Sequence, residues 1–124
     1  MCEASMFGDK NDVSTLEQTR CTIVEASNWF ERHLDEEDTV IMKINAEGAE
    51  VHILNNLIDS GQIWRIHNVM IDWDCRKVPS IAHCEHDILA RFREIGFDRY
   101  SLCDDVMRGA THQSRIGNWL STIA

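Results

Sequence analysis

The chain has 124 residues, of which 44% are hydrophobic and 27% charged, a composition typical of one globular domain over residues 1–124. The formal net charge is −9, from 21 acidic and 12 basic residues. This balance argues against a nucleic-acid or anionic-membrane partner, because both require a positive footprint. No apolar run reaches transmembrane length, and the N-terminus shows no signal-peptide pattern.

The chain opens with a polar stretch, residues 1–20, which has no clear period and predicts a loop or a poorly ordered start. Residues 21–24 favour β-structure and predict a short strand. Ser27 is a candidate N-cap for a helix over 28–34. The possible inward positions of that helix are Trp29, Phe30 and His33.

A nearly continuous apolar run over 39–44 is rich in β-branched residues and fits a strand buried on both faces. A helix is expected next, ending at Ser60-Gly61. Residues 66–71 form a second apolar run of strand length. The apolar positions with helical spacing between the two runs are Val51, Leu54, Leu57 and Ile58.

A polar loop through Pro79 leads to a second amphipathic helix, which runs from about residue 85 to Gly96. Its inward set is Ile88, Leu89, Phe92 and Ile95. Residues 97–103 and 118–123 predict the last two strands. Because no helix is expected between these two strands, they are predicted to pair as an antiparallel hairpin.

This order of strands and helices predicts the α/β class, with βαβ units, a mostly parallel sheet, helices on its faces and an antiparallel terminal hairpin. By analogy, a parallel sheet whose last strand turns back is typical of Rossmann-like methyltransferases.

The segment 43–50, Lys-Ile-Asn-Ala-Glu-Gly-Ala-Glu, resembles the signature of the FkbM-type S-adenosylmethionine-dependent methyltransferases. The similarity continues through later leucines, Gly61 and an acidic-aromatic strand end, and is strongest from about Thr22 to Gly96. The resemblance implies a partial Rossmann-like fold, S-adenosylmethionine as cofactor, and methyl transfer to a small-molecule or glycan acceptor.

Two departures from the family pattern limit what the resemblance implies. Asn45 stands where the family has Asp, which keeps the hydrogen-bonding shape but removes the charge. No Gly-rich cofactor turn is present, so the chain resembles the C-terminal half of a methyltransferase, is expected to be inactive alone, and has no assigned cofactor-binding residues. The alternative is a non-catalytic α/β binding or oligomerising half-domain, whose exposed sheet edge would form a homo-oligomer.

Polar residues follow the two predicted central strands, where open α/β sheets place their ligands. From the resemblance, Glu47 and Asp74 are the candidate catalytic residues. The candidate substrate-binding residues are Asn45, Asp72 and Trp73. Other interpretations remain open at this stage: Glu47 and Glu50 as first-turn helix acids, Trp73 as a packing residue, and Asp74 as a loop cap.

The five cysteines are Cys2, Cys21, Cys75, Cys84 and Cys103. An odd, scattered set without a Cys-x-x-Cys pair is typical of reduced thiols, so we expect a cytoplasmic protein.

A rival zinc site would combine Cys and His side chains from one loop. Its members are Cys75, His83, Cys84 and His86, with His67 nearby. Their spacing matches no standard zinc motif, and the interpretation adopted from the sequence has no metal. A nucleophilic cysteine at Cys75 or Cys84 is weaker still, because acidic surroundings disfavour a thiolate.

Overall fold

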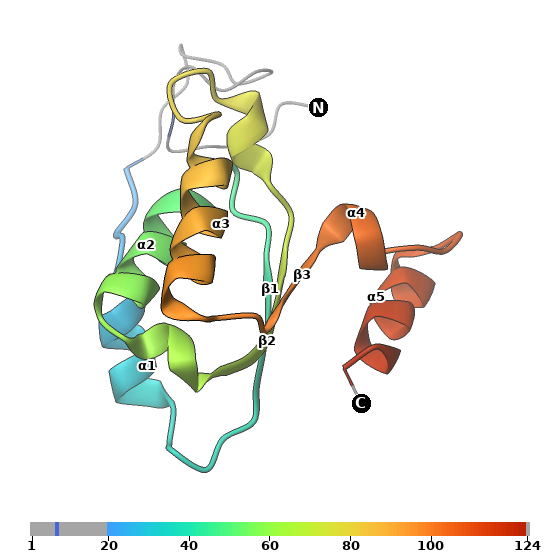
Figure 1. Ribbon diagram of the computed structural model, residues 1–124, viewed down its shortest axis with the longest axis horizontal. Coiled ribbons are helices and arrows are strands. Elements are labelled where there is room, and N and C mark those ends of the chain that lie inside the picture. Colours follow the sequence, from blue (N-terminus) through green and yellow to red (C-terminus); the bar gives the residue numbers. More distant parts are fainter. Residues whose placement is uncertain (1–6, 8–19, 124) are drawn as a thin grey trace.

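A computed structural model describes Phe7 and residues 20–123 of the chain. Three parallel strands form a sheet in the order β1-β2-β3 (Figure 1). The strands are β1 (Val40–Ile44), β2 (Ile66–Ile71) and β3 (Tyr100–Leu102). The predicted 1–20 loop lies outside the described residues, apart from Phe7 and Arg20.

Each pair of neighbouring strands is joined by a helix that crosses back over the sheet. The helices are α1 (Ala26–His33), α2 (Glu50–Asp59), α3 (Cys84–Ile95), α4 (Cys103–Val106) and α5 (His112–Ser121), with short 3-10 turns η1 (Gln62–Arg65) and η2 (Asp74–Lys77). Figure 1 shows α1, α2 and α3 on one side of the sheet and α4 and α5 on the other. The predicted α/β class is confirmed, as a three-stranded parallel sheet flanked by helices, consistent with a partial Rossmann-like fold.

The hydrophobic core lies between the sheet and the helices α1 to α3. Its fully buried members include Leu54, Leu57, Ile63, Ile66, Val69, Ile71, Ile88 and Phe92. The helical residues among them are those whose spacing predicted an inward face, and each buried side chain of this size contributes about 1.5–3 kcal/mol. Both central strands and the two crossover helices are therefore fixed by one continuous apolar layer.

Two predicted strands are wrong. Residues 21–24 have no regular structure and are exposed, while 118–123 belongs mainly to α5. The Thr111 side chain accepts from the Ser114 backbone N–H, and the Ser114 hydroxyl is paired with the Thr111 backbone N–H, so a capping box starts a helix there. The antiparallel terminal hairpin is therefore wrong, and every strand pairing among the described residues is parallel.

The first helix begins two residues earlier than predicted, and Ser27 does not cap it. Its backbone N–H instead donates to the Asn56 side chain at 2.7 Å, which ties α1 to α2. Phe30 is buried as expected, whereas Trp29 and His33 are exposed. The strand predicted over 97–103 from its alternating pattern is confirmed only over 100–102, as the short strand β3.

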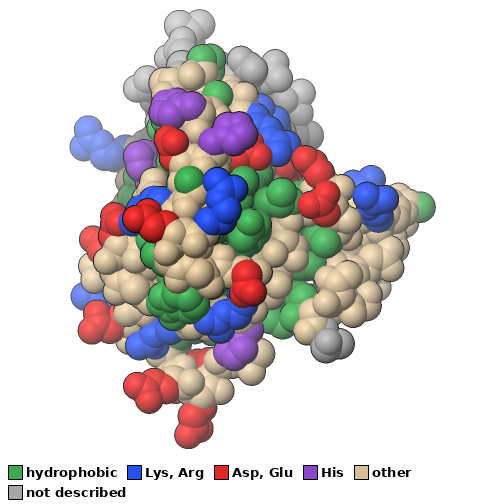
Figure 2. All heavy atoms as spheres, in the orientation of Figure 1, with side chains coloured by type: hydrophobic (Ala, Val, Ile, Leu, Met, Phe, Trp, Pro, Cys, Tyr) green, Lys and Arg blue, Asp and Glu red, His purple; other side chains and the backbone are tan. Residues whose placement is uncertain are grey.

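The far face of the sheet is covered only in part. Trp119 of α5 is buried, and its indole Nε1 donates to the Asn68 Oδ1 of β2 at 3.3 Å. In Figure 2, acidic and basic side chains are interspersed over the visible face, and hydrophobic side chains show between the main body and the C-terminal helices. The side chains of Ile41 and Lys43 on β1 remain exposed.

Candidate functional site

The carboxyl ends of β1 and β2 meet, because Ile44 pairs with Ile71 in the parallel register. The Asp72 N–H donates to the Ile44 carbonyl at 2.9 Å, which closes the end of the ladder. Asn45 follows directly, and its Nδ2 donates to the Asp74 Oδ2 at 2.8 Å and to the Asp72 Oδ2 at 3.3 Å. Three of the five candidate residues are therefore brought together at one edge of the sheet.

Asp74 is the buried member of this group, with 3% of its surface exposed. Besides the Asn45 amide, its Oδ2 accepts from the Glu47 backbone N–H at 3.3 Å. Its Oδ1 lies 3.1 Å from the Lys77 Nζ, three residues further along η2. A buried carboxylate with this many donors is compensated electrostatically and holds the loops after both strands in place.

Glu47 occupies a sharp turn between β1 and α2. Its φ of 55° and the φ of 101° at Gly48 both lie in the left-handed region. A Cβ on Gly48 would come within 2.9 Å of the Phe7 ring, so a side chain there would force the ring to move and would strain the backbone. Glu47 is half-buried, and its backbone N–H bond to Asp74 fixes where the turn lies.

Glu50 is fully buried at the start of α2. The sequence left open whether this residue is only a first-turn helix acid. Its Oε2 accepts from the Gly48 N–H at 2.8 Å, and its Oε1 accepts from the Cys75 N–H at 2.5 Å. Burial raises the pKa of Glu50, while these backbone bonds act in the opposite direction. Its position four residues before Leu54, on the apolar stripe of α2, is the sequence signal for this burial.

Trp73 lies in the core and is 4% exposed. No described residue accepts a hydrogen bond from its buried indole Nε1. This placement favours the packing interpretation of Trp73 over contact with a substrate.

Cys103 follows β3 as Asn45 follows β1, and sequence reasoning did not assign it to the site. Burial raises the pKa of the Cys103 thiol, and the neighbouring charge of Asp72 adds to the effect. Each of the three parallel strands is therefore followed directly by a polar or titratable side chain at the same edge. The signal in the sequence was its position after a third strand, but that strand was predicted over 97–103 and so included Cys103 within it.

The residues of the rival zinc set are not gathered into one group. In the part of the chain that is described, the group with metal-ligand spacing consists of His83, Cys84 and Asp87. Cys75 lies in the core, where burial raises the pKa of its thiol to about 12. Burial also raises the pKa of Cys84, so neither thiol is activated as a nucleophile.

A scan against known protein families, a search of characterised proteins and a search of solved structures find no match to this chain. Within the described residues, no helix has the length and apolar character needed to cross a bilayer.

The arrangement offers hydrogen-bonding groups to a polar ligand at the rim. Asn45 is exposed and Asp72 is half-buried, whereas Asp74 is enclosed beneath them. A carboxylate in this setting can accept a hydrogen bond from a hydroxyl group or take up its proton. The glycines among the described residues are isolated from one another, and they do not form a turn that fits S-adenosylmethionine.

Proposed function

We propose that this chain is the acceptor-side half of an FkbM-type S-adenosylmethionine-dependent methyltransferase. It would methylate a small-molecule or glycan acceptor only when a cofactor-binding half is supplied. The observation that carries the proposal is the convergence of Asn45, Asp72 and Asp74 at the carboxyl ends of two adjacent parallel strands. Ligands of open α/β sheets bind at this edge.

In this proposal Asn45 and Asp72 bind the acceptor, since their polar atoms reach the rim of the site. The candidate catalytic carboxylates are Glu47, half-buried on the turn, and Asp74. The buried Asp74 acts mainly by holding the Asn45 amide and the Glu47 turn in position. Trp73 supports the site from the core side.

The described residues do not fit the cofactor, so the proposal assigns S-adenosylmethionine binding to a segment or chain beyond these 124 residues. A cytoplasmic location is part of the proposal. It is supported by the free state of the cysteines within the described residues, which are Cys21, Cys75, Cys84 and Cys103.

The test is reconstitution. The chain is co-produced with a cofactor-binding half from an FkbM-type methyltransferase, and S-adenosylhomocysteine release is measured over a panel of polyols and oligosaccharides. The proposal predicts acceptor-dependent release that Asp74→Ala lowers at least about tenfold, because removing one positioning group misaligns the acceptor. Asp98→Ala, an equal loss of charge at an exposed position, serves as the control. A soluble pair whose activity is unchanged by Asp74→Ala contradicts the assigned site.

A second candidate function is the non-catalytic oligomerising half-domain. It is favoured by the surroundings of β1. The outer edge of this strand pairs with no described strand, and an apolar groove of about 550 Å³ lies beside it.

A further inference from the structure

The open edge of β1 presents backbone groups that lack a partner strand among the described residues. The Ile44 carbonyl accepts from Asp72, so the backbone of Ile44 faces β2. Val40 faces the same way, since its N–H donates to the His67 ring Nδ1 at 3.0 Å. Backbone direction alternates along a strand, so the N–H and C=O groups of Ile41 and Lys43 point outward.

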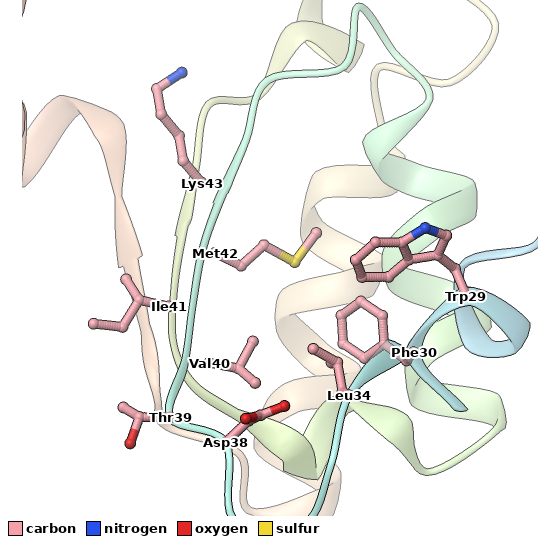
Figure 3. Close-up of a pocket in the computed structure, with 9 residues that line it drawn as sticks. All are labelled: Trp29, Phe30, Leu34, Asp38, Thr39, Val40, Ile41, Met42 and Lys43. Carbon is pink, nitrogen blue, oxygen red and sulfur yellow. The ribbon is translucent and has the colours of Figure 1, made fainter. Parts of the chain in front are cut away.

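The same edge is lined by apolar side chains that the fold leaves accessible. Figure 3 shows Val40 and Met42 pointing from β1 toward Phe30 and Leu34, with Trp29 alongside them in the groove. Ile41 points to the other face of the sheet and is 44% exposed, and Trp29 is 46% exposed. An edge with apolar surface on both sides is suited to bind another strand.

The charges at the two ends of β1 indicate the direction of that strand. The turn before β1 carries four exposed acids, Asp35 to Asp38, whereas Lys43 lies exposed near the far end. Within the described part of the chain, no ion pair is found for Lys43. An antiparallel copy of β1 would bring each Lys43 beside the acidic turn of the other copy.

We infer that two copies of this chain associate through antiparallel pairing of β1 with β1, across a two-fold axis at Ile41. In this register Lys43 of each copy lies opposite Thr39 of the other copy, next to its acidic turn. The two Ile41 residues lie opposite each other. Val40 of each copy then lies opposite Met42 of the other copy, on the face of the sheet that carries the groove. The two three-stranded sheets become one continuous sheet, and the outer edges of both β1 strands are closed.

This inference rests on the second proposed function, the oligomerising half-domain, and adds the partner, the orientation and the register. Because β1 has one open edge, a second copy and any cofactor-binding half that paired there would exclude each other.

The experiment measures the mass of the full chain by sedimentation velocity over a range of concentrations. The wild-type chain is expected to be a dimer. Lys43→Glu, or Glu36→Lys with Glu37→Lys, is expected to raise the dissociation constant at least about tenfold. The first substitution sets like charges against each other, and the second cancels the net negative charge of the acidic turn. Mixing the two variants restores the dimer, since each reversed charge then meets its opposite. The control substitutions Arg93→Glu and Glu94→Lys, on the exposed face of α3, leave the wild-type dimer unchanged.

A second variant, Ile41→Asp, keeps the test independent of the charge pairs. Its side chain is half-exposed, so circular dichroism should match the wild-type chain while the dimer dissociates. A wild-type chain that is monomeric at every concentration overturns both this inference and the oligomerising function. A dimer that none of these substitutions weakens, or variants that fail to restore one another, overturns the antiparallel β1 interface and leaves oligomerisation through another surface.

Discussion

The Asn45 side-chain amide donates to the Asp74 carboxylate at 2.8 Å and thereby joins the loops that follow β1 and β2. The same amide also reaches Asp72. An amide at this position is a donor between two carboxylates, so Asn suits the geometry of this site.

Asn45→Asp is therefore expected to destabilise the chain by about 1–3 kcal/mol at pH 7, because a donor is replaced by a third negative charge beside two carboxylates. Urea unfolding of both chains measures the difference. Asn28→Asp, the same chemical change at an exposed position of α1, is the control. Equal stability of Asn45→Asp and wild type at pH 7 would show that the amide bonds do not hold the two loops.

Glu50→Gln is expected to cost about 1–3 kcal/mol, because the amide would turn a donor toward one of two backbone N–H groups. Burial raises the pKa of Glu50, so the folded state keeps this proton at pH values where the unfolded chain has lost it. The stability that this proton contributes is present at low pH and is lost as the pH rises through the folded pKa. The advantage of wild type over the variant should therefore shrink as the pH rises above the ordinary glutamate pKa of 4.5.

Unfolding by urea at several pH values measures that advantage directly. Glu94→Gln on the exposed surface of α3 controls for the loss of one charge. An advantage of wild type that grows with rising pH contradicts the account of Glu50.

Cys75 should resist alkylation in the folded chain. Its thiol is fully buried, and burial raises its pKa to about 12, so the reactive thiolate is scarce at pH 8. Cys21 is exposed and should be labelled first by iodoacetamide. Peptide mass spectrometry after timed labelling measures each site, and labelling in urea should remove the difference. Labelling of Cys75 at the rate of Cys21 in the folded chain would contradict its place in the core.

Trp119→Ala should release α5 from the sheet, because the substitution removes the buried ring and its hydrogen bond to Asn68. Hydrogen exchange is expected to accelerate at least about tenfold over 112–121 while α2 keeps its protection. Leu120→Ala, on the same helix at a position that is 42% exposed, should change little. Equal loss of protection in α2 would mean that α5 belongs to the main cooperative unit.

The central elements of the fold could be predicted because their apolar runs are unambiguous. The segment 39–44 has the length and β-branched content of a buried strand, and the inward face of α3 repeats at helical spacing. The segment 118–123 was misassigned because Trp119, Leu120 and Ile123 also fit a helix with one apolar face. The capping box at Thr111 and Ser114 decides between the two, and it lies outside the apolar run.

The candidate site could be predicted in part for a related reason. Parallel strands end at a common edge, so the proximity of Asn45 and Asp72 follows from the strand topology alone. The contacts of Glu50 and Lys77 depend on the path of the turns after those strands, and the sequence spacing does not define that path. The turn at Glu47 and Gly48 and the 3-10 turn η2 bring Glu50 to Cys75 and Lys77 to Asp74.

The central claim is that this chain supplies the acceptor side of a methyltransferase and lacks the cofactor side. A calorimetric titration of S-adenosylmethionine tests it most directly, first with the purified chain and then with the chain joined by a cofactor-binding half. The account predicts no binding by the chain alone and one cofactor bound per reconstituted pair. Stoichiometric binding of S-adenosylmethionine by the chain alone would contradict it.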